Sequence, residues 1–499
     1  MAEAVRRQAA ARPDRLAIVD ADRRLSWQDL GRLVERVTAR LRTEGIGRGT
    51  MVASLAENSA AHLAVYLGAL GAGACVVPLP TGAHEAALRR MAQNCDPALL
   101  FASARQNEVA GRLGPPVVDL DALESWLDTD TPGLAESAEP EPVGPDDLFD
   151  MIYSSGTTGM PKGILHDHRF RSRQIMRMAN YGLNGDAVCL MSTPLYSNTT
   201  LVAVLPVLAH GGTLVVMGKF ETRGFLELAE RHRVSHAMLV PVQYRRILDD
   251  ADFDRFDLSA FRVKLSTSAP LPAATIRAAL ERWPGKLIEI YGMTEGGIST
   301  MLDCAAHPDK LDTVGRPVAG AEVRILDPQE RPLPPGEVGE VVGRSPTMMV
   351  GYYKSPQSTA EMLWRSPEGE DFFRTGDMGR LDADGFLTLL DRRKDMILSG
   401  GFNIYAADLE QVLLVHPDVA EAAVIAVPSE QWGETPLGLV VLGTGAAVDA
   451  QVLCDWANAR LGKTQRLSAV EIRPSLPRSA IGKVLKRELR AAYWAKAAT

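Results

Sequence analysis

The sequence predicts an α/β fold with a large N-terminal domain of mixed α/β layers and a small C-terminal α+β domain. Residues 60–72 have the pattern of a helix, and residues 75–78 have that of a buried strand. The same alternation returns at residues 213–217, 225–232 and 236–240. Strands that alternate with helices in this way form largely parallel sheets covered by helices.

The character of the sequence changes between residues 316 and 391, where glycines, prolines and short β-like pieces predict a β-rich subdomain. The roughly one hundred residues that follow suffice for a compact domain of their own. We therefore expect an N-terminal domain at residues 1–393 and a small domain at residues 394–499. Residues 129–147 are rich in proline and acidic residues and predict an exposed loop.

Composition argues against several classes of protein. Apolar residues make up 46% and charged residues 23% of the chain, as in ordinary globular proteins. A net charge of -8 argues against nucleic acid as a partner, because phosphate backbones favour a basic surface. Five scattered cysteines predict neither a disulfide framework nor a zinc site. We see no signal peptide and no membrane span, so we expect a soluble cytoplasmic protein, with its oligomeric state open.

The sharpest local signal is the segment Tyr153-Ser154-Ser155-Gly156-Thr157-Thr158-Gly159-Met160-Pro161-Lys162-Gly163. An apolar strand leads into glycines, hydroxyl residues and a lysine, and a helix-like segment follows them in the sequence. Glycines let backbone N–H groups approach phosphate oxygens, and hydroxyls add donors. Pro161 and Gly163 distinguish the segment from a Walker A loop. A plain Ser/Thr/Gly turn is the alternative, but this density of donors favours a phosphate loop.

This segment resembles the phosphate loop of the adenylate-forming superfamily, which contains acyl-CoA synthetases, peptide-synthetase adenylation domains and beetle luciferases. Further motifs match in order over essentially the whole chain. The resemblance implies an enzyme that uses ATP and Mg²⁺ to convert a carboxylic acid to its acyl-adenylate and then transfers the acyl group to coenzyme A. It assigns the ATP phosphates to Ser154, Ser155, Gly156, Thr157, Thr158, Gly159 and Lys162.

The string Tyr291-Gly292-Met293-Thr294-Glu295 resembles the family's second core motif. The resemblance implies that the Tyr291 ring packs on adenine, that Thr294 contacts the α-phosphate, and that Glu295 helps to hold Mg²⁺, a hard cation that takes carboxylate oxygens. Ser268-Ala269-Pro270 resembles the segment whose backbone lines the adenine, and Glu289 is a candidate acceptor for the adenine amino group. Alone, Thr294-Glu295 would be a common start of a helix.

The string Thr375-Gly376-Asp377 and the later Arg392 form the next pair. A carboxylate can accept both ribose hydroxyls, and an arginine beside it can reach the ribose or a phosphate. Asp384-Gly385 predicts a hairpin turn that returns the chain and places Asp377 near Arg392. An ordinary charged surface hairpin is the alternative.

Three positions near the C-terminus match further motifs of the family. Lys394 matches the hinge about which the small domain rotates between two half-reactions. Gly401 lies in a segment that resembles the one entering the active site for the second half-reaction, where the pantetheine arm needs close backbone approach. Lys483, in the string at 477–484, matches the adenylation lysine. Its alternative is a solvated lysine of a basic tail.

The sequence does not identify which carboxylic acid is the substrate. In amino-acid adenylation domains an aspartate pairs with the substrate ammonium, and Ser197 takes that position here, so a buried ammonium would lack its partner. Many acyl-CoA and aryl-CoA synthetases have histidine there, and the chain departs from them as well. A pocket of mixed polarity suits a medium-sized aromatic, alicyclic or short branched acid. Its candidate residues are Ser197, Asn198, Thr199, His236, Met238, Gly292 and Gly297.

Two alternatives to a CoA ligase stay open. One is a free-standing adenylation enzyme that loads a separate carrier protein. The other is a non-catalytic binding module of the same fold, and the presence of Lys483, Glu295, Asp377 and Arg392 together argues against it.

Overall fold

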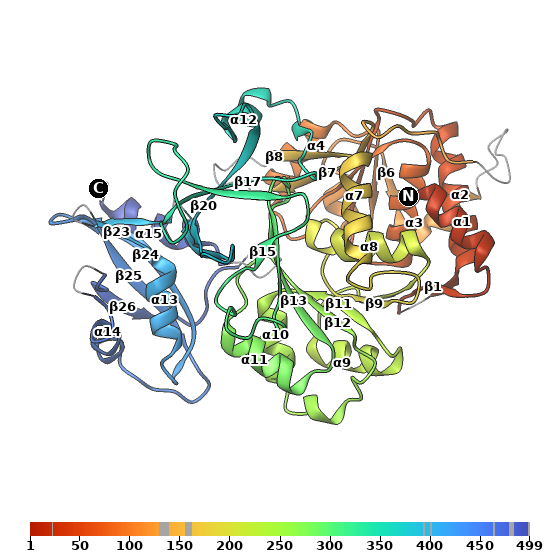
Figure 1. Cartoon of the computed structure of the whole chain (residues 1–499). Helices are drawn as coiled ribbons and strands as arrows, with labels where there is room; N and C mark the ends of the chain where they lie inside the picture. Colours follow the sequence, from red (N-terminus) through yellow and green to blue (C-terminus); the bar gives the residue numbers. More distant parts are fainter. Residues whose placement is uncertain are drawn as a thin grey trace. The chain divides into compact units, whose positions relative to one another are not determined.

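The computed structural model describes residues 1–21, 23–128, 139–154, 162–392, 395–399, 402–462, 465–478 and 484–497 (Figure 1). The chain divides into two compact units, which we treat separately. The first comprises Met1–Glu322 and Arg344–Phe373, and the second comprises Val323–Gly343 and Arg374–Thr499. The predicted α/β class, with a large N-terminal part and a small C-terminal domain, is confirmed. The predicted boundary at residues 393/394 lies outside the described residues and stays a prediction.

One sheet of the first unit has the strand order β15-β14-β13-β12-β11-β9-β10-β1-β2. Its inner strands are parallel, as the alternating sequence predicts, whereas β2, β14 and β15 pair antiparallel at its edges. The strands are β1 (Leu16–Val19), β2 (Arg24–Ser26), β9 (Val188–Met191), β10 (Thr213–Val216), β11 (His236–Leu239), β12 (Val263–Ser266), β13 (Lys286–Gly292), β14 (Ser299–Asp303) and β15 (Arg316–Pro317).

A second sheet of the first unit has the order β18-β8-β7-β4-β3-β5-β6. Strands β3, β4, β5, β6 and β7 pair parallel, and β8 and β18 add antiparallel strands beyond β7. The strands are β3 (Met51–Leu55), β4 (Cys75–Pro78), β5 (Leu99–Ala102), β6 (Val117–Asp119), β7 (Leu148–Ser154), β8 (Lys162–Asp167) and β18 (Gly351–Tyr352).

Strand β8 corrects one expectation about the phosphate loop. The sequence predicted a loop followed by a helix-like segment. In the structure Lys162 first begins a strand that pairs antiparallel with β7, and the helix α7 (His168–Ala179) follows that strand. Gly163 permits this pairing, because a Cβ there would lie 2.5 Å from the Met151 sulfur. The predicted phosphate loop therefore connects two antiparallel strands.

The remaining helices of the first unit cover the sheets and fill the connections between their strands (Figure 1). They are α1 (Ala2–Ala11), α2 (Trp27–Thr43), α3 (Ala60–Gly71), α4 (Glu85–Cys95), α5 (Asn107–Ala110), α6 (Leu123–Leu127), α8 (Asn198–His210), α9 (Thr222–Arg231), α10 (Pro241–Leu248), α11 (Ala273–Arg282) and α12 (Pro356–Glu361).

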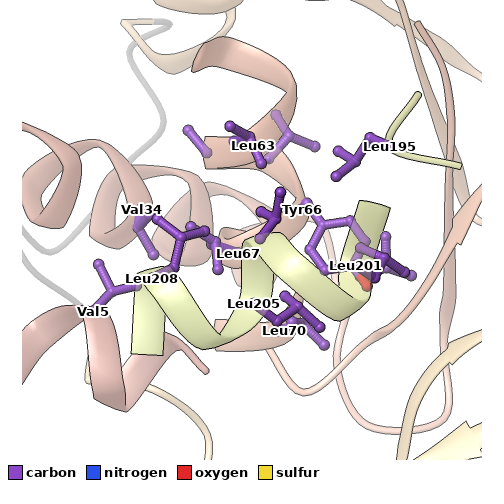
Figure 2. Close-up of a cluster of buried hydrophobic side chains, with 14 of the residues drawn as sticks. Val5, Val34, Leu63, Tyr66, Leu67, Leu70, Leu195, Leu201, Leu205 and Leu208 are labelled. Atoms are coloured by element: carbon purple, nitrogen blue, oxygen red, sulfur yellow. The ribbon is translucent and has the colours of Figure 1, made fainter. Parts of the chain in front are cut away.

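Helix α3 lies at the centre of the main core. Its residues are apolar on all sides, which is typical of a helix buried on all faces. Its glycines allow α2 to approach closely, because a Cβ at Gly68 would lie 2.4 Å from the Val37 side chain. Figure 2 shows the leucines of α8 lying against α3, with side chains of α1 and α2 nearby. This packing places the first turn of α8, which contains candidate pocket residues, on a rigid base.

The second unit contains two groups of strands. In the first, β16 (Glu322–Leu326), β17 (Gly339–Arg344) and β20 (Asp371–Leu381) are neighbours in that order, and β21 (Leu387–Arg392) pairs with β20. These short strands agree with the predicted β-rich subdomain. The first three residues of β20, 371–373, belong to the first unit, where they pair with β19 (Leu363–Arg365).

The second group is a sheet of order β23-β22-β25-β24, with β26 beside β25. Helices α13 and α14 pack on one core of this sheet, and α15 contributes to another. The elements are β22 (Ile397–Ser399), β23 (Phe402–Ile404), β24 (Val419–Ser429), β25 (Gly433–Leu442), β26 (Ala469–Ile472), α13 (Ala406–Leu414), α14 (Ala450–Asn458) and α15 (Lys486–Ala497).

Candidate active site

The second core motif forms a tight turn between β13 and β14, and not the start of a helix. Gly296 and Gly297 have φ angles of 70° and 75°, which favour glycine. The backbone of residues 347–349 holds this turn: Gly297 N donates to Thr347 O at 2.8 Å, and Met349 N donates to Glu295 O at 2.8 Å. A Cβ at Gly296 would lie 1.9 Å from Thr347 O, so only glycine fits.

Tyr352 fixes the side chain of Glu295, and the sequence analysis missed this role. The Tyr352 hydroxyl donates to Glu295 Oε1 at 2.9 Å, and Glu295 is only 8% exposed. Lys162 Nζ lies 4.6 Å from the centre of the Tyr352 ring, a cation–π distance. Burial and the neighbouring Glu295 carboxylate raise the pKa of Tyr352 well above its ordinary value, so its hydroxyl stays a donor.

A buried charged cluster lies on β7, β8 and α7. Asp150, His166 and Arg171 have fully buried side chains. Arg171 donates to both carboxylate oxygens of Asp150 at 2.9 Å, and His166 Nδ1 lies 2.7 Å from Asp150 Oδ1. Tyr66 of α3 donates to the same carboxylate at 2.8 Å. Burial alone would raise the pKa of Asp150, but Arg171 and His166 hold it well below its ordinary value.

The sequence analysis missed this cluster, although a signal for it was present. Asp150 is an acidic residue inside the apolar strand β7, and a charge in a buried strand requires partners. The partners His166 and Arg171 follow 16 and 21 residues later. Their identity depended on how β7, β8 and α7 pack together.

The first turn of α8 brings acyl-pocket candidates next to the predicted adenine segment. Ser197 is the N-cap residue of α8, and Asn198 Oδ1 accepts a hydrogen bond of 2.7 Å from Arg171 Nη1. The Thr199 and Ser268 hydroxyl oxygens are 2.8 Å apart. Ser268 has a φ of 80°, a strained conformation for a residue with a side chain, of the kind often found at functional sites. Ala269 and Pro270 follow directly at the end of β12.

The structure does not bring His236 together with these residues. His236 begins β11, whereas Ser268 follows the opposite, C-terminal end of the neighbouring parallel strand β12. Its ring contacts Ser235, and a Cβ at Gly182 would lie 2.7 Å from its Nε2 atom. Burial lowers the pKa of His236 to about 4, so its ring is neutral at neutral pH. Met238, farther along β11, is buried in the main core together with residues of α8.

Glu289 and Tyr291 lie on the same face of β13, because side chains alternate along a strand. Glu289 Oε1 accepts from Leu271 N at 3.3 Å, while Oε2 has no hydrogen-bond partner among the described residues. Burial raises the pKa of Glu289 to about 7. Gly292 ends the strand and is exposed, and a Cβ there would lie 3.1 Å from Ile298 O.

In the second unit, the predicted hairpin is confirmed. Asp377 and Arg392 are direct partners in the antiparallel pairing of β20 with β21, and Arg392 Nε lies 2.6 Å from Asp377 Oδ1. Gly385 has a φ of 81° in the connecting turn, as a glycine there allows. The backbone N–H of Asp377 also donates to the Thr375 hydroxyl oxygen at 3.0 Å.

Several predicted site residues lie outside the described part of the chain. They are Ser155, Gly156, Thr157, Thr158, Gly159, Lys394, Gly401 and Lys483. Ser154 pairs with Lys162 through the backbone of β7 and β8, so both ends of the predicted phosphate loop are described. Within the described residues, no helix is long and apolar enough to cross a membrane.

Comparison with known proteins identifies the family. The model of the AMP-binding enzyme family matches residues 5–353, and the model of the AMP-binding enzyme C-terminal domain matches residues 408–483. The chain belongs to the AMP-binding enzyme family. The predicted resemblance to adenylate-forming enzymes is therefore confirmed.

Three relatives indicate the range of this similarity. The chain is 34% identical to a feruloyl-CoA synthase of Amycolatopsis sp over 97% of both chains. It is 30% identical to an indoleacetate–CoA ligase of Aromatoleum aromaticum, covering 98% of this chain and 97% of the relative. The solved structure of an amide bond synthetase from Marinactinospora thermotolerans matches with a TM-score of 0.86 and 30% identity, covering 99% of this chain and 100% of that one.

Proposed function

We propose that the chain is an AMP-forming ligase that joins a medium-sized aromatic carboxylic acid to coenzyme A. In the first half-reaction, the acid carboxylate attacks the α-phosphorus of ATP, acyl-AMP forms, and pyrophosphate leaves. In the second, the CoA thiol attacks the acyl carbon, the thioester forms, the thiol proton is released, and AMP leaves. The proposal rests mainly on the match to feruloyl-CoA synthase over 97% of both chains.

The first half-reaction needs no general base, because a carboxylate is already ionised at neutral pH. It needs the approach of two anions, with developing charge neutralised, so positioning and electrostatics supply the acceleration. In this proposal Lys483 bridges the acid carboxylate and the α-phosphate, Thr294 contacts the α-phosphate, and the loop from Ser154 to Lys162 holds the pyrophosphate. Ser268-Ala269-Pro270 and Tyr291 contact the adenine in this proposal, and Asp377 and Arg392 bind the ribose.

The second half-reaction uses the same adenylate in a second arrangement of the chain. Rotation about Lys394 brings Gly401 toward the adenylate, where the small residue admits the pantetheine arm. The nucleophilic sulfur comes from CoA, so no cysteine of the protein takes part. The five cysteines are free and buried, which fits the proposed cytoplasmic location.

Glu295 fits the role of a Mg²⁺ ligand. It provides a carboxylate oxygen, and the Tyr352 hydroxyl holds the side chain in one place. Among the described residues, no three His, Cys, Asp or Glu side chains gather as a metal site. In many ATP-using enzymes Mg²⁺ is bound through one or two carboxylates together with substrate phosphates. Bound Mg²⁺ would offset the negative charge of the phosphates.

The acceptor has one further candidate, an amine. The amide bond synthetase matches over nearly all of both chains at 30% identity, close to the values for the CoA ligases. An amine acceptor would leave the first half-reaction unchanged and replace the thioester by an amide. A separate carrier protein is the remaining alternative.

The proposal is tested by supplying ATP, Mg²⁺ and a panel of aromatic, alicyclic and branched acids, with CoA, an amine or a carrier protein as acceptor. Pyrophosphate release reports the first step, and mass spectrometry identifies the product. We expect pyrophosphate release with an aromatic acid and a CoA thioester as product. Lys483→Ala should abolish adenylate formation yet still convert supplied acyl-AMP. Arg487→Ala changes an exposed residue of the same tail and should leave both activities unchanged. No pyrophosphate with any acid would refute ligase function, and acyl-AMP without thioester would refute CoA as acceptor.

A further inference from the structure

The buried charged cluster reaches two parts of the candidate active site. His166 Nε2 lies 2.7 Å from the carbonyl oxygen of Thr294, 128 residues along the chain. Arg171 Nη1 donates to the Asn198 side-chain oxygen at 2.7 Å, at the first residue of α8. Asp150 holds both His166 and Arg171. One carboxylate thus connects the turn assigned to the α-phosphate with the helix end assigned to the acid.

The contacts of the His166 ring show which of its nitrogens holds the turn. Nε2 donates to the Thr294 carbonyl, which can only accept. Nδ1 faces both Asp150 Oδ1 at 2.7 Å and Arg171 Nη2 at 3.1 Å. Asp150 is ionised, because Arg171 donates to both its oxygens. Asp150 and Arg171 form a buried ion pair beside the His166 ring. The ring also stacks on Phe170, with the ring centres 4.1 Å apart, so its orientation is fixed.

Stability alone does not explain such a cluster. Desolvation of buried charges can exceed their mutual attraction, and apolar side chains of similar volume are often at least as stabilising. The cluster does, however, hold the Thr294 backbone and the Asn198 side chain. The distance between these two positions matters for the attack of a carboxylate on a phosphate. A misplacement of about 1 Å at such a site can cost about a hundredfold in rate.

We propose that His166 and Arg171, both held by Asp150, are positioning residues for adenylation: His166 fixes the turn at Thr294–Glu295, and Arg171 fixes Asn198 at the acid pocket. This inference rests on the proposed function. His166 acts through Thr294, and Arg171 acts through Asn198, so neither needs to touch a substrate. The two ends of the cluster affect different substrates, ATP at one end and the acid at the other.

The test is ATP–pyrophosphate exchange by the full chain, with kcat and the KM of each substrate measured separately. His166→Phe keeps the ring stack but removes both hydrogen bonds, and we expect kcat to fall about a hundredfold. His166→Gln places an amide donor near the Thr294 carbonyl and should recover part of that loss. Asn198→Ala should raise the KM for the acid and leave the KM for ATP nearly unchanged.

His62 provides a matched control. It is a buried histidine of α3, with its ring nitrogens 2.8 Å from the Ser54 hydroxyl and 3.1 Å from Glu57 O. We expect His62→Phe to change the thermal midpoint about as much as His166→Phe, but not kcat. Equal losses of kcat in the two variants would mean that burial, and not the Thr294 contact, matters.

The outcomes separate this inference from the proposed function. If the wild-type protein exchanges no pyrophosphate with any acid, the proposed function fails. If it does, and folded His166→Phe exchanges as fast as the wild type, the positioning role is wrong. Should His166→Phe not fold, Asn198→Ala decides: an unchanged KM for the acid in that variant overturns the inference.

Discussion

Two buried carboxylates in the first unit have pKa values shifted in opposite directions, although both are equally deep in the protein. Asp150 on β7 and Glu289 on β13 are each at most 3% exposed. The pKa of Asp150 lies well below its ordinary value, because Arg171 and His166 outweigh the effect of burial. Burial raises the pKa of Glu289 to about 7, and no cation pairs with it among its described contacts. Partners, more than depth, decide the charge of a buried acid.

The difference suggests different roles. Asp150 has a permanent charge whose partners fix the positions of Thr294 and Asn198. Glu289 titrates near neutral pH, and its Oε2 atom has no partner within the described residues. A ligand donor could satisfy that atom, which agrees with its predicted role as acceptor for the adenine amino group. That role stays a prediction.

The largest expected effect is the loss of stability when the charge of Asp150 is removed. Asp150→Asn leaves Arg171 buried without its counter-charge, and breaking a buried pair in this way costs about 3–5 kcal/mol. We expect the free energy of unfolding of the first unit to fall by about that amount in urea denaturation. Asp146→Asn is the control, because Asp146 pairs with Arg169 at the surface and is 79% exposed. A small effect of both changes would show that the cluster does not stabilise the fold.

The second prediction tests Glu289 through pH. Its folded-state pKa of about 7 exceeds its ordinary value of 4.5, so the folded protein keeps a proton that the unfolded chain releases. Stability is therefore lost as pH rises from about 4.5 to 7. Glu289→Gln removes this loss and should be more stable than the wild type by about 3 kcal/mol at high pH.

Thermal unfolding at several pH values between about 5 and 8 measures this difference. The gap between Glu289→Gln and the wild type should widen with pH. Glu281→Gln, on the exposed face of α11, should follow the wild type throughout. A constant gap at all pH values would contradict a raised pKa for Glu289.

A third buried carboxylate has a more exposed partner. Asp377 is buried, but the side chain of its partner Arg392 is 32% exposed and can be hydrated when the carboxylate is removed. Asp377→Ala should therefore cost less stability than Asp150→Asn, but it removes the proposed ribose acceptor. Loss of a charged hydrogen bond costs about 1.5–3 kcal/mol, so we expect the KM for ATP to rise about ten- to a hundredfold. Asp384→Ala, at the exposed tip of the same hairpin, is the control; calorimetry showing equal ATP affinity for all three proteins would exclude the ribose role.

The smallest expected effect concerns Glu295. Tyr352→Phe keeps the ring below Lys162 but removes the hydroxyl that donates to the Glu295 carboxylate. Losing one hydrogen bond to a charged group should raise the Mg²⁺ concentration needed for half-maximal pyrophosphate release about tenfold. Tyr353→Phe alters the adjacent ring and should have no such effect. If both variants need the same Mg²⁺ as the wild type, Tyr352 does not position Glu295.

Local sequence patterns determined much of what is observed. Helix and strand periodicity predicted α3, β4, β10 and β11 to within a few residues, because each pattern reflects which side of one element faces the core. Asp384-Gly385 predicted the hairpin that joins Asp377 to Arg392, because turn chemistry acts over a few neighbouring residues. The motif strings identified the family for the same reason, since each is a short contiguous segment.

Only the tertiary structure decided which distant side chains meet. Whether Lys162 began a helix or a strand depended on pairing with β7, and that pairing placed His166 beside Asp150. Likewise, Tyr352 reaches Glu295 across 57 residues because β18 pairs with β8. His236 shows the converse, since its type suited a pocket but its place on β11 put it at the far end of the sheet. A residue's type limits the bonds it can form, but its partner is selected by the packing of whole strands and helices, which no local pattern contains.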